Sequence, residues 1–398
     1  MTRKKQVLKL TYLFAFTYMI SYMTRINFGA VVAEMETATG ISRQLLSISL
    51  TGSFITYGIG QLVSGVAGDR ISPKRLVTLG LFLTTLMNSL LPLCQSPWQM
   101  LGVWCANGFA QAFLWPPIIK LMTALLDDEE YQFASTRVYW GSSVGTMVIY
   151  LLSPVLIALF SWRATFWFSA LCGGVGIVFW NLLIQEPANV CRQGGVKGAS
   201  ATRHLFAPMM IGVMLAIVML GMLRDGITTW MPTYIADTYQ LGNLISILTG
   251  VILPLFSILC VQITAPLYRK KLRNPMLCAG VIFGMGALSA CLLFLCFDQS
   301  AALSVLLAAL LTGSMHGVNF ILVGILPSFF RKYGNTSAAS GVLNACTYIG
   351  SALSTYGIAL LSKGIGWSQT VLIWFFVALA GTGLCLVCIK PWAKEYSA

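Results

Sequence analysis

The sequence has 398 residues, of which 57% are hydrophobic and only 9% are charged. Soluble domains carry about 25% charged residues, so this composition excludes a large soluble core and indicates a polytopic membrane protein. The formal net charge is +13. Because the basic residues cluster in short loops between apolar runs, this charge indicates membrane topology, and we expect no nucleic-acid partner.

Apolar segments follow one another along the whole chain, and we expect each to form a transmembrane helix. The first segment follows Arg3, Lys4 and Lys5 and is too long for the apolar part of a signal peptide, so we interpret it as an uncleaved helix. The expected fold class is an all-α membrane protein with twelve transmembrane helices in two six-helix bundles. The segments lie near 8–33, 45–68, 76–95, 99–125, 132–160, 164–185, 206–236, 241–267, 276–297, 300–329, 337–362 and 367–390.

A polar, glycine-rich and basic stretch at 186–205 separates the sixth segment from the seventh and has the composition of a linker. We therefore expect an N-terminal bundle at 1–185 and a C-terminal bundle at 206–398. Lysine and arginine concentrate at the N-terminus, in the even-numbered turns and in the C-terminal tail, which predicts that both termini are cytoplasmic. An acidic run at 127–130 lies on the same side, but acidic residues contribute little to this bias.

One arginine lies deep within the first apolar segment and another within the seventh. Arg25 and Arg224 are 224 − 25 = 199 residues apart, half the length of the chain. An unpartnered guanidinium in hydrocarbon costs about 2.5–3.5 kcal/mol or more, so each is expected to face a cavity or a partner. The alternative is an internal salt bridge or snorkelling. Asp225 is a neighbour of Arg224, but adjacent helical residues point in different directions, so we do not expect these two to face each other.

The two halves also share a basic turn after their second helix. Matching features of this kind indicate a transporter built from two repeats, with the substrate site between them near the midplane. In the first half this turn, from Gly65 to Arg75, resembles the signature loop of the major facilitator superfamily. A solvated turn would explain the basic residues but not the acid, so we expect a cytoplasmic charge cluster that latches helices together. Its members are Asp69, Arg70, Lys74 and Arg75.

Five further pieces, in order and each in the corresponding helix, resemble the organophosphate:phosphate antiporter family, which includes glycerol-3-phosphate and hexose-6-phosphate transporters. The seventh helix carries the most specific of them. The pieces are Tyr18, Tyr22, Arg25, Asn27 and Phe28; Tyr57 with Gly58, followed by Asp69, Arg70 and Pro73; Trp115, Pro116 and Pro117; Arg224, Gly226, Ile227, Trp230, Pro232, Thr233 and Tyr234; and the run from Ala338 to Gly350 with Tyr348.

The resemblance implies a phosphoryl-binding site with one arginine from each half, and the planar fork of arginine suits phosphate oxygens. We expect the tyrosines to line the same cavity, with an interfacial aromatic belt as the alternative. Trp115 either lines the cavity or packs at a helix break. The residues expected at the site are Arg25, Arg224, Tyr18, Tyr22, Tyr57, Gln61, Trp115, Ser142, His316 and Tyr348.

The sequence departs from the family pattern at two of these positions. Gln61 stands where the family commonly has lysine, and Ser142 where some relatives have histidine. Lys120 and Arg137 could replace the lost cations, although we favour snorkelling to the cytoplasmic surface for both. His316 is either a pH-sensitive group near the site or a histidine that packs between helices.

The apolar segments contain few carboxylates, which favours anion exchange over proton-driven uptake. In this hypothesis the empty carrier reorients reluctantly because its two positive charges lack a counter-ion. A non-transporting sensor of phosphate esters and a carrier of another organic anion, drug or sugar are the alternatives. The sequence carries no metal-spaced cluster, nucleophile–base pair or P-loop, so we expect neither an enzyme nor a cofactor. The expected partners are the lipid bilayer and a phosphate ester or inorganic phosphate, and we expect a monomer in a bacterial inner membrane.

Overall fold

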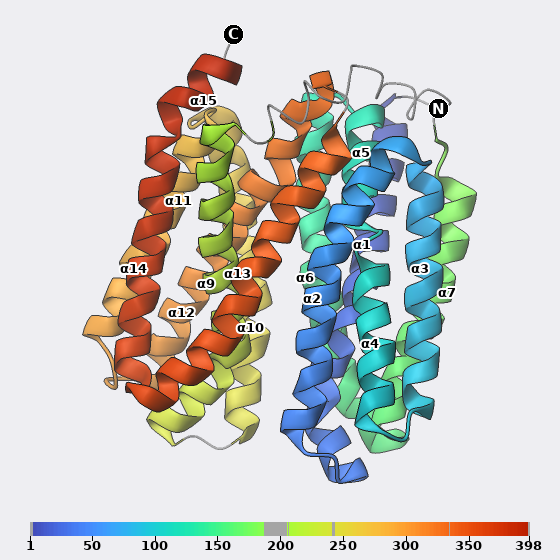
Figure 1. Cartoon of the computed structure of the whole chain (residues 1–398), viewed down its shortest axis with the longest axis vertical. Helices are drawn as coiled ribbons and strands as arrows, with labels where there is room; N and C mark the ends of the chain where they lie inside the picture. The colour runs from blue at the N-terminus through green and yellow to red at the C-terminus, as the bar shows by residue number, and fades with distance from the viewer. Residues whose placement is uncertain (1–2, 187–204, 206, 241–242, 334, 397–398) are drawn as a thin grey trace. The chain divides into compact units, whose positions relative to one another are not determined.

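The computed structural model describes residues 3–186, 205, 207–240, 243–333 and 335–396, and every element in them is helical (Figure 1). Each of the twelve expected segments coincides with one helix or with consecutive helical pieces. Most of the expected linker lies outside the described residues. The elements of the first half are α1 Arg3–Thr39, α2 Arg43–Arg70, α3 Pro73–Leu90, η1 Leu91–Leu93, α4 Pro97–Gln111, α5 Trp115–Leu125, α6 Asp128–Leu159 and α7 Trp162–Leu183.

The second half repeats this helical pattern and ends in a short additional helix. Eight helical segments of the described residues are long and apolar enough to cross a membrane. The elements are α9 Pro208–Tyr239, α10 Asn243–Lys270, α11 Pro275–Leu295, α12 Ala301–Asn319, η3 Phe320–Ile325, η4 Leu326–Tyr333, α13 Thr336–Gly364, α14 Gly366–Val387 and α15 Ile389–Tyr396.

Four of the expected segments contain more than one helical piece, and two of them are interrupted well inside their length. The segment expected at 99–125 breaks after Gln111, and α5 starts at Trp115 with Pro116 and Pro117 in its first turn. Proline lacks an N–H group and blocks the preceding helical turn, so it begins a helix more readily than it continues one. The segment expected at 300–329 passes from α12 into the π-helical η3 and then the 3₁₀-helical η4.

The chain forms two compact units, which we call unit 1 and unit 2. Unit 1 comprises Met1–Lys197 and Phe330–Ala345, and unit 2 comprises Gly198–Phe329 and Cys346–Ala398. The start of α13 therefore belongs to unit 1 and the rest of this helix to unit 2. The division of the chain into bundles at 1–185 and 206–398 stays a prediction.

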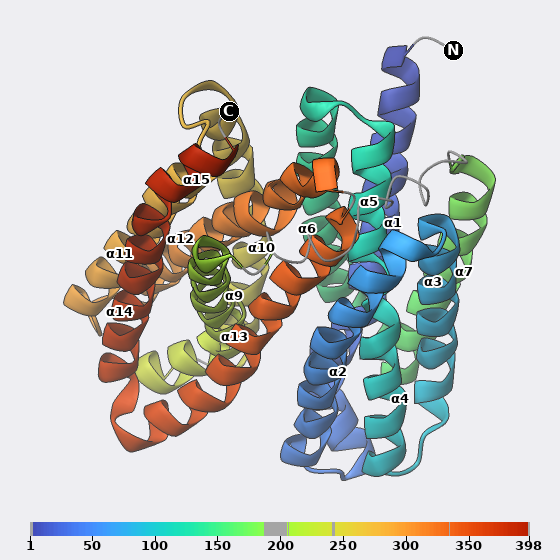
Figure 2. The ribbon, with the colours of Figure 1, turned by 45° about the horizontal axis from the view of Figure 1, so that its top comes forward.

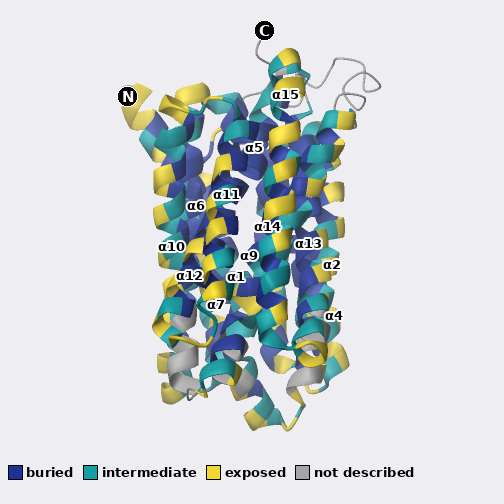
Figure 3. Ribbon diagram, turned by 90° about the vertical axis from the view of Figure 1, so that its left-hand side faces the viewer, coloured by how far each residue is buried: buried dark blue, intermediate teal, exposed yellow. Residues whose placement is uncertain are grey.

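Within each unit the helices pack in pairs along their length. In unit 1, α1 packs on α6, α2 on α4 and α3 on α7, and Figure 2 shows α3 beside α7. In unit 2, α11 packs on α14 and α12, and α9 packs on α14. Figure 3 shows α5 buried, and every residue of 115–123 in this helix is buried. By contrast, α7 exposes large apolar side chains such as Leu171 and Leu182, as expected for a face toward lipid.

A network of amides and hydroxyls that are fully or almost fully buried holds α1, α3 and α4 together. Asn88 on α3 accepts a hydrogen bond from Asn27 of α1 at 2.7 Å and donates to the Thr24 carbonyl at 2.9 Å. Gln111 on α4 donates to the Thr24 and Thr84 hydroxyls, both at 2.8 Å, and accepts from Ser21 at 2.7 Å. Because buried polar groups need partners, this network specifies how the three helices are positioned.

Two glycines of the polar run at 141–145 allow α6 to approach α1 closely. A Cβ atom on Gly141 would overlap the carbonyl oxygen of Ala15, and one on Gly145 would overlap that of Met19. Glycine at these two positions is therefore required by backbone packing. A Cβ on Gly102 of α4, by contrast, would meet nothing within 4 Å.

We expect Gly141→Ala to destabilise the protein by about 1–3 kcal/mol, the usual cost of overpacking. Gly102→Ala is the matched control, and it should leave stability unchanged or raise it by up to about 1 kcal/mol, because alanine favours the helix. Thermal unfolding of both purified variants in the same detergent measures the difference. Equal unfolding temperatures for the two variants would contradict the close approach of α6 to α1.

Candidate functional site

The predicted site residues of α1 gather into an aromatic cluster in unit 1. The rings of Tyr18 and Tyr22 lie 5.2 Å apart, and Tyr18 also contacts Trp115 of α5, with ring centroids 4.8 Å apart. Tyr18 and Tyr22 are four residues apart, and Arg25 lies three further along, so all three occupy one face of the helix. The cluster places three predicted residues from two helices together.

Arg25 stacks on this cluster. Its guanidinium carbon lies 4.2 Å from the centroid of the Tyr22 ring and 5.0 Å from that of Tyr57 on α2. Stacking of this kind stabilises the cation through the faces of the aromatic rings. The planar guanidinium also carries N–H groups that recognise phosphate oxygens. Arg25 therefore remains a candidate for an oxyanion site in unit 1.

Gln61 and Ser142, the two departures from the family pattern, have different surroundings. Gln61 follows Tyr57 by one turn of α2 and is completely buried, and neither atom of its side-chain amide has a hydrogen-bond partner. The indole N–H of Trp115 is likewise buried without a partner. Ser142 instead donates to the Tyr139 carbonyl of its own helix at 2.7 Å. Buried amides without partners are rare, so Gln61 is a candidate for contact with a ligand.

The predicted site residues of the second half lie in unit 2, around an ion pair that we did not expect. Arg224 donates from Nε to Asp225 Oδ1 at 2.6 Å and from Nη2 to Oδ2 at 2.8 Å. The expectation that these adjacent residues do not face each other was wrong. The two side chains start in different directions, but the arginine is long enough to curve back and bind the carboxylate with its fork.

Two neighbouring helices complete this second cluster. Ser351 of α13 donates a hydrogen bond to Asp225 Oδ2. Tyr348 lies about one turn before Ser351 on α13 and is buried. His316 of α12 is within electrostatic reach of both Arg224 and Asp225. Arg224, His316 and Tyr348 thus belong to unit 2, whereas the other predicted site residues belong to unit 1.

Of the residues expected in the charge cluster after α2, Asp69 contacts the start of α13 and a lysine of α5. Asp69 accepts hydrogen bonds from the backbone amides of Ser337 at 3.1 Å and Ala338 at 2.8 Å, at the N-terminus of α13. Its carboxylate also lies 3.1 Å from Nζ of Lys120 on α5. The first amides of a helix lack intrahelical partners and attract negative charge, so Asp69 caps α13.

The basic residues after Asp69 lie elsewhere. Arg70 and Arg75 are exposed. Lys74 donates to the carbonyls of Asn181 and Ile184 at the end of α7, both at 3.0 Å. Snorkelling of Lys120 was also a wrong expectation, because its side chain is only 5% exposed and is paired with Asp69. The basic turn follows Asp69 in the sequence, but the residue that pairs with Asp69 is Lys120, because α5 packs on α2.

Residues 14–355 match the Major Facilitator Superfamily, and this range is more than half of the chain. The chain belongs to this superfamily. A probable hexose phosphate transport protein of Chlamydia muridarum is 23% identical over 437 residues, which cover 98% of this chain and 92% of the relative. The membrane sensor protein UhpC of Salmonella typhimurium is 24% identical over 405 residues, which cover 94% of this chain and 88% of that protein.

The fold agrees with this assignment. The solved structure of the proton:xylose symporter XylE, bound to 6-bromo-6-deoxy-D-glucose, matches with a TM-score of 0.80 at 11% identity, over 99% of this chain and 97% of XylE. The predicted resemblance to organophosphate transporters and the predicted fold class are confirmed. The prediction that this superfamily member is not an enzyme is confirmed as well.

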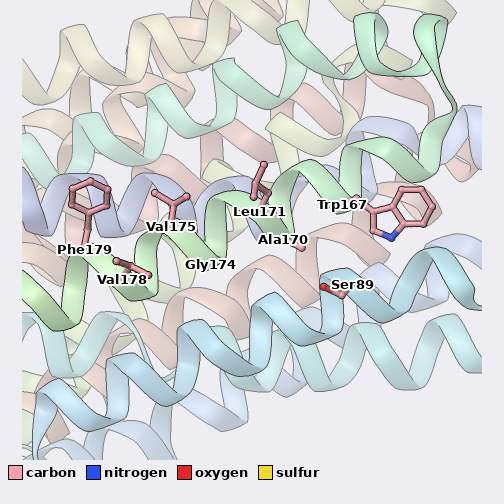
Figure 4. A pocket seen from close by; sticks show the side chains of 8 residues that line it. All are labelled: Ser89, Trp167, Ala170, Leu171, Gly174, Val175, Val178 and Phe179. Atoms are coloured by element: carbon pink, nitrogen blue, oxygen red, sulfur yellow. The ribbon is translucent and has the colours of Figure 1, made fainter.

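An open groove of about 720 Å³ runs along α7 in unit 1 (Figure 4). Its lining is almost entirely apolar, and only one residue comes from α3. No predicted site residue lines it, so this groove is not the candidate substrate site. The lining residues are Ser89, Trp167, Ala170, Leu171, Gly174, Val175, Val178 and Phe179.

The pairing of Asp69 with Lys120 predicts a specific pattern of stability. Asp69→Asn leaves a buried ammonium without its counter-ion and should cost about 3–5 kcal/mol. Lys120→Met should also destabilise the protein, and the double variant should lose less than the sum of the two single losses, because the residues interact. Unfolding of all three variants in detergent measures this coupling.

Arg70→Gln is the control, because Arg70 is exposed and lies next to Asp69 in the sequence. Its effect should stay within about 0.5 kcal/mol, as for most surface substitutions. A loss at Arg70 as large as that at Lys120 would instead support the charge cluster expected from the sequence.

Proposed function

We propose that the protein is a secondary transporter that exchanges a phosphorylated organic anion for inorganic phosphate by alternating access. The observation that carries this proposal is Arg25, a permanent cation within a membrane-spanning helix, which lies over the rings of Tyr22 and Tyr57. Gln61, one turn after Tyr57 on α2, has a buried amide without a hydrogen-bond partner. The hexose phosphate transport relative, similar over almost its whole length, supports a sugar phosphate or a related ester as the transported anion.

In this proposal Arg25 from the first half and Arg224 from the second bind the phosphoryl group of the substrate. Arginine forms bidentate, charge-assisted hydrogen bonds with phosphate oxygens, and these bonds are strong where water is excluded. Tyr18, Tyr22, Tyr57 and Tyr348 would donate further hydrogen bonds to the phosphate or to sugar hydroxyls. Trp115, Ser142 and His316 complete the proposed set.

The proposal includes the topology expected from the loop charges. Both termini would be cytoplasmic, in a bacterial inner membrane, and the protein would act as a monomer with six helices in each half. Asp69 would then stabilise one state of the transport cycle by capping α13, and its bonds with Ser337 and Ala338 would break when the transporter changes state. The conformational latch would consist of Asp69 and Lys120, with Arg70, Lys74 and Arg75 outside it.

A non-transporting sensor is the second candidate function, because one relative of similar length is named a membrane sensor protein. Such a protein would also bind a phosphate ester through arginines. Binding of esters to the purified protein without any flux across a membrane would favour this alternative. A carrier of a different organic anion, drug or sugar would not require both arginines.

Exchange of phosphate in proteoliposomes tests the proposal. Vesicles that hold the purified protein and unlabelled phosphate should take up radiolabelled phosphate rapidly. Arg25→Lys and Arg224→Lys should each lower this rate at least tenfold, because lysine keeps the charge but loses the planar fork. Arg75→Lys, at an exposed position, is the control and should exchange like the unchanged protein. Exchange that persists in both site variants would contradict the proposed site.

Gln61→Met separates a role in binding from a role in stability. The buried amide has no hydrogen-bond partner, so replacing it with an apolar side chain of similar length should raise the free energy of unfolding by roughly 1–3 kcal/mol. If the amide contacts the substrate, the same variant should raise the KM for phosphate exchange severalfold. Exchange kinetics and thermal unfolding on one preparation measure both effects. A more stable variant with unchanged KM would remove Gln61 from the site.

A further inference from the structure

The ion pair within α9 neutralises the positive charge that Arg224 contributes to the second half of the proposed site. Arg224 is 6% exposed and holds both oxygens of Asp225 with its fork, at 2.6 and 2.8 Å. The pair has no net charge. Arg25 of unit 1 lies over the rings of Tyr22 and Tyr57. The charge of Arg224 is thus balanced by a carboxylate of its own helix.

The packing of α9 on α13 fixes the carboxylate in this position. Cβ atoms added to Gly221 of α9 and Gly350 of α13 would overlap backbone atoms of the opposite helix, so the two helices lie in direct contact. Ser351 is on the contacting face of α13 and donates its hydroxyl hydrogen to Asp225. Asp225 is thus held by two donors from two helices, and its place beside Arg224 is built into the fold of unit 2.

An internal carboxylate bears directly on how the empty carrier behaves. Obligatory exchange requires that the carrier reorient only when an anion neutralises its arginines. An unpaired buried charge is strongly unfavourable, and a counter-ion of the protein removes this penalty as an anionic substrate would. With Asp225 bound to Arg224, the empty carrier already has one of its two arginines neutralised. From the sequence we expect a barrier to reorientation from two positive charges without counter-ions. In unit 2 this contribution to the barrier is absent, because Asp225 is the counter-ion of Arg224.

We propose that Asp225 is an internal counter-ion that permits the empty carrier to reorient, so that the protein performs net uptake of the anion as well as exchange. This inference rests on the proposed transport function. In the loaded carrier, phosphate oxygens compete with Asp225 for the fork of Arg224, and Ser351 retains the released carboxylate. Asp225 thereby sets the balance between the two transport modes.

Two uptake measurements on the same proteoliposomes test this inference. Exchange is the initial uptake of radiolabelled phosphate into vesicles loaded with unlabelled phosphate, and net uptake is the same measurement into vesicles without it. Because net uptake of an anion moves charge, potassium and valinomycin clamp the membrane potential. The unchanged protein should show both activities. Asp225→Asn should lower the ratio of net uptake to exchange at least tenfold while exchange continues.

Two further variants identify the cause of the change. Asp237→Asn makes the same substitution at an exposed position of the same helix and should leave the ratio unchanged. Ser351→Ala removes the hydrogen bond to Asp225 but keeps its charge, so most of the net uptake should remain. A loss of net uptake in Ser351→Ala equal to that in Asp225→Asn would overturn the role of charge.

The remaining outcomes separate this inference from the proposed function. Exchange without net uptake in the unchanged protein would overturn the inference alone. An unchanged ratio in Asp225→Asn, or equal loss of both activities in a variant that still unfolds cooperatively, would do the same. No phosphate flux of either kind from the unchanged protein would overturn the proposed function and, with it, this inference.

Discussion

Burial of a charge among apolar helices is the constraint on which this structure depends. Water does not reach such a position to solvate the charge, so the protein itself must supply a partner. Lys120 and Arg224 are buried and Arg25 is half-buried, and each has different neighbours. Lys120 pairs with the carboxylate of Asp69, Arg224 with its neighbour Asp225, and Arg25 with the faces of two tyrosines. The choice of partner decides what each cation can still do.

A carboxylate partner gives a neutral unit, and that suits a structural role. Asp69 neutralises Lys120 and at the same time caps α13, so one side chain joins α2, α5 and the part of α13 in unit 1. Gly65 and Gly68 allow this, since side chains there would overlap or crowd atoms of residues 337–341. Aromatic partners leave the charge of a cation in place, and that suits binding of an anion. The contacts of Arg25 with Tyr22 and Tyr57 are of this kind, and they fit its place in the proposed anion site.

The sequence predicted the helices well because long apolar runs bounded by polar turns have few other structures in a membrane. It placed 99–125 in one segment, and a helix break at Trp115 was only one of two alternatives, although Pro116 and Pro117 signal the start of α5. The predictions for the partners of Lys120 and Arg224 were wrong for a different reason. Each partner depends on which atoms two or three packed helices bring together, or on how a long side chain curves, and neither follows from spacing along one helix.

The buried amides illustrate the same limit. In the sequence, Asn88 and Gln111 are polar residues within apolar segments. In the structure, both donate hydrogen bonds to Thr24 of α1 and belong to one network. Gln61 looks similar in sequence but has no partner for either amide atom. Only the packed structure therefore distinguishes a buried amide that joins helices from one without a hydrogen-bond partner.

The two arginines show how a repeated architecture can acquire unequal halves. Equivalent positions 199 residues apart provide each half with a cation in its first helix, 224 − 25 = 199. The residue after each arginine differs, since Ile26 is uncharged and Asp225 forms an ion pair with Arg224. In the proposed transporter, a substrate anion would compete with Asp225 for Arg224. In that proposal, charge balance in the membrane would connect one side chain on α9 to the choice between exchange and net transport.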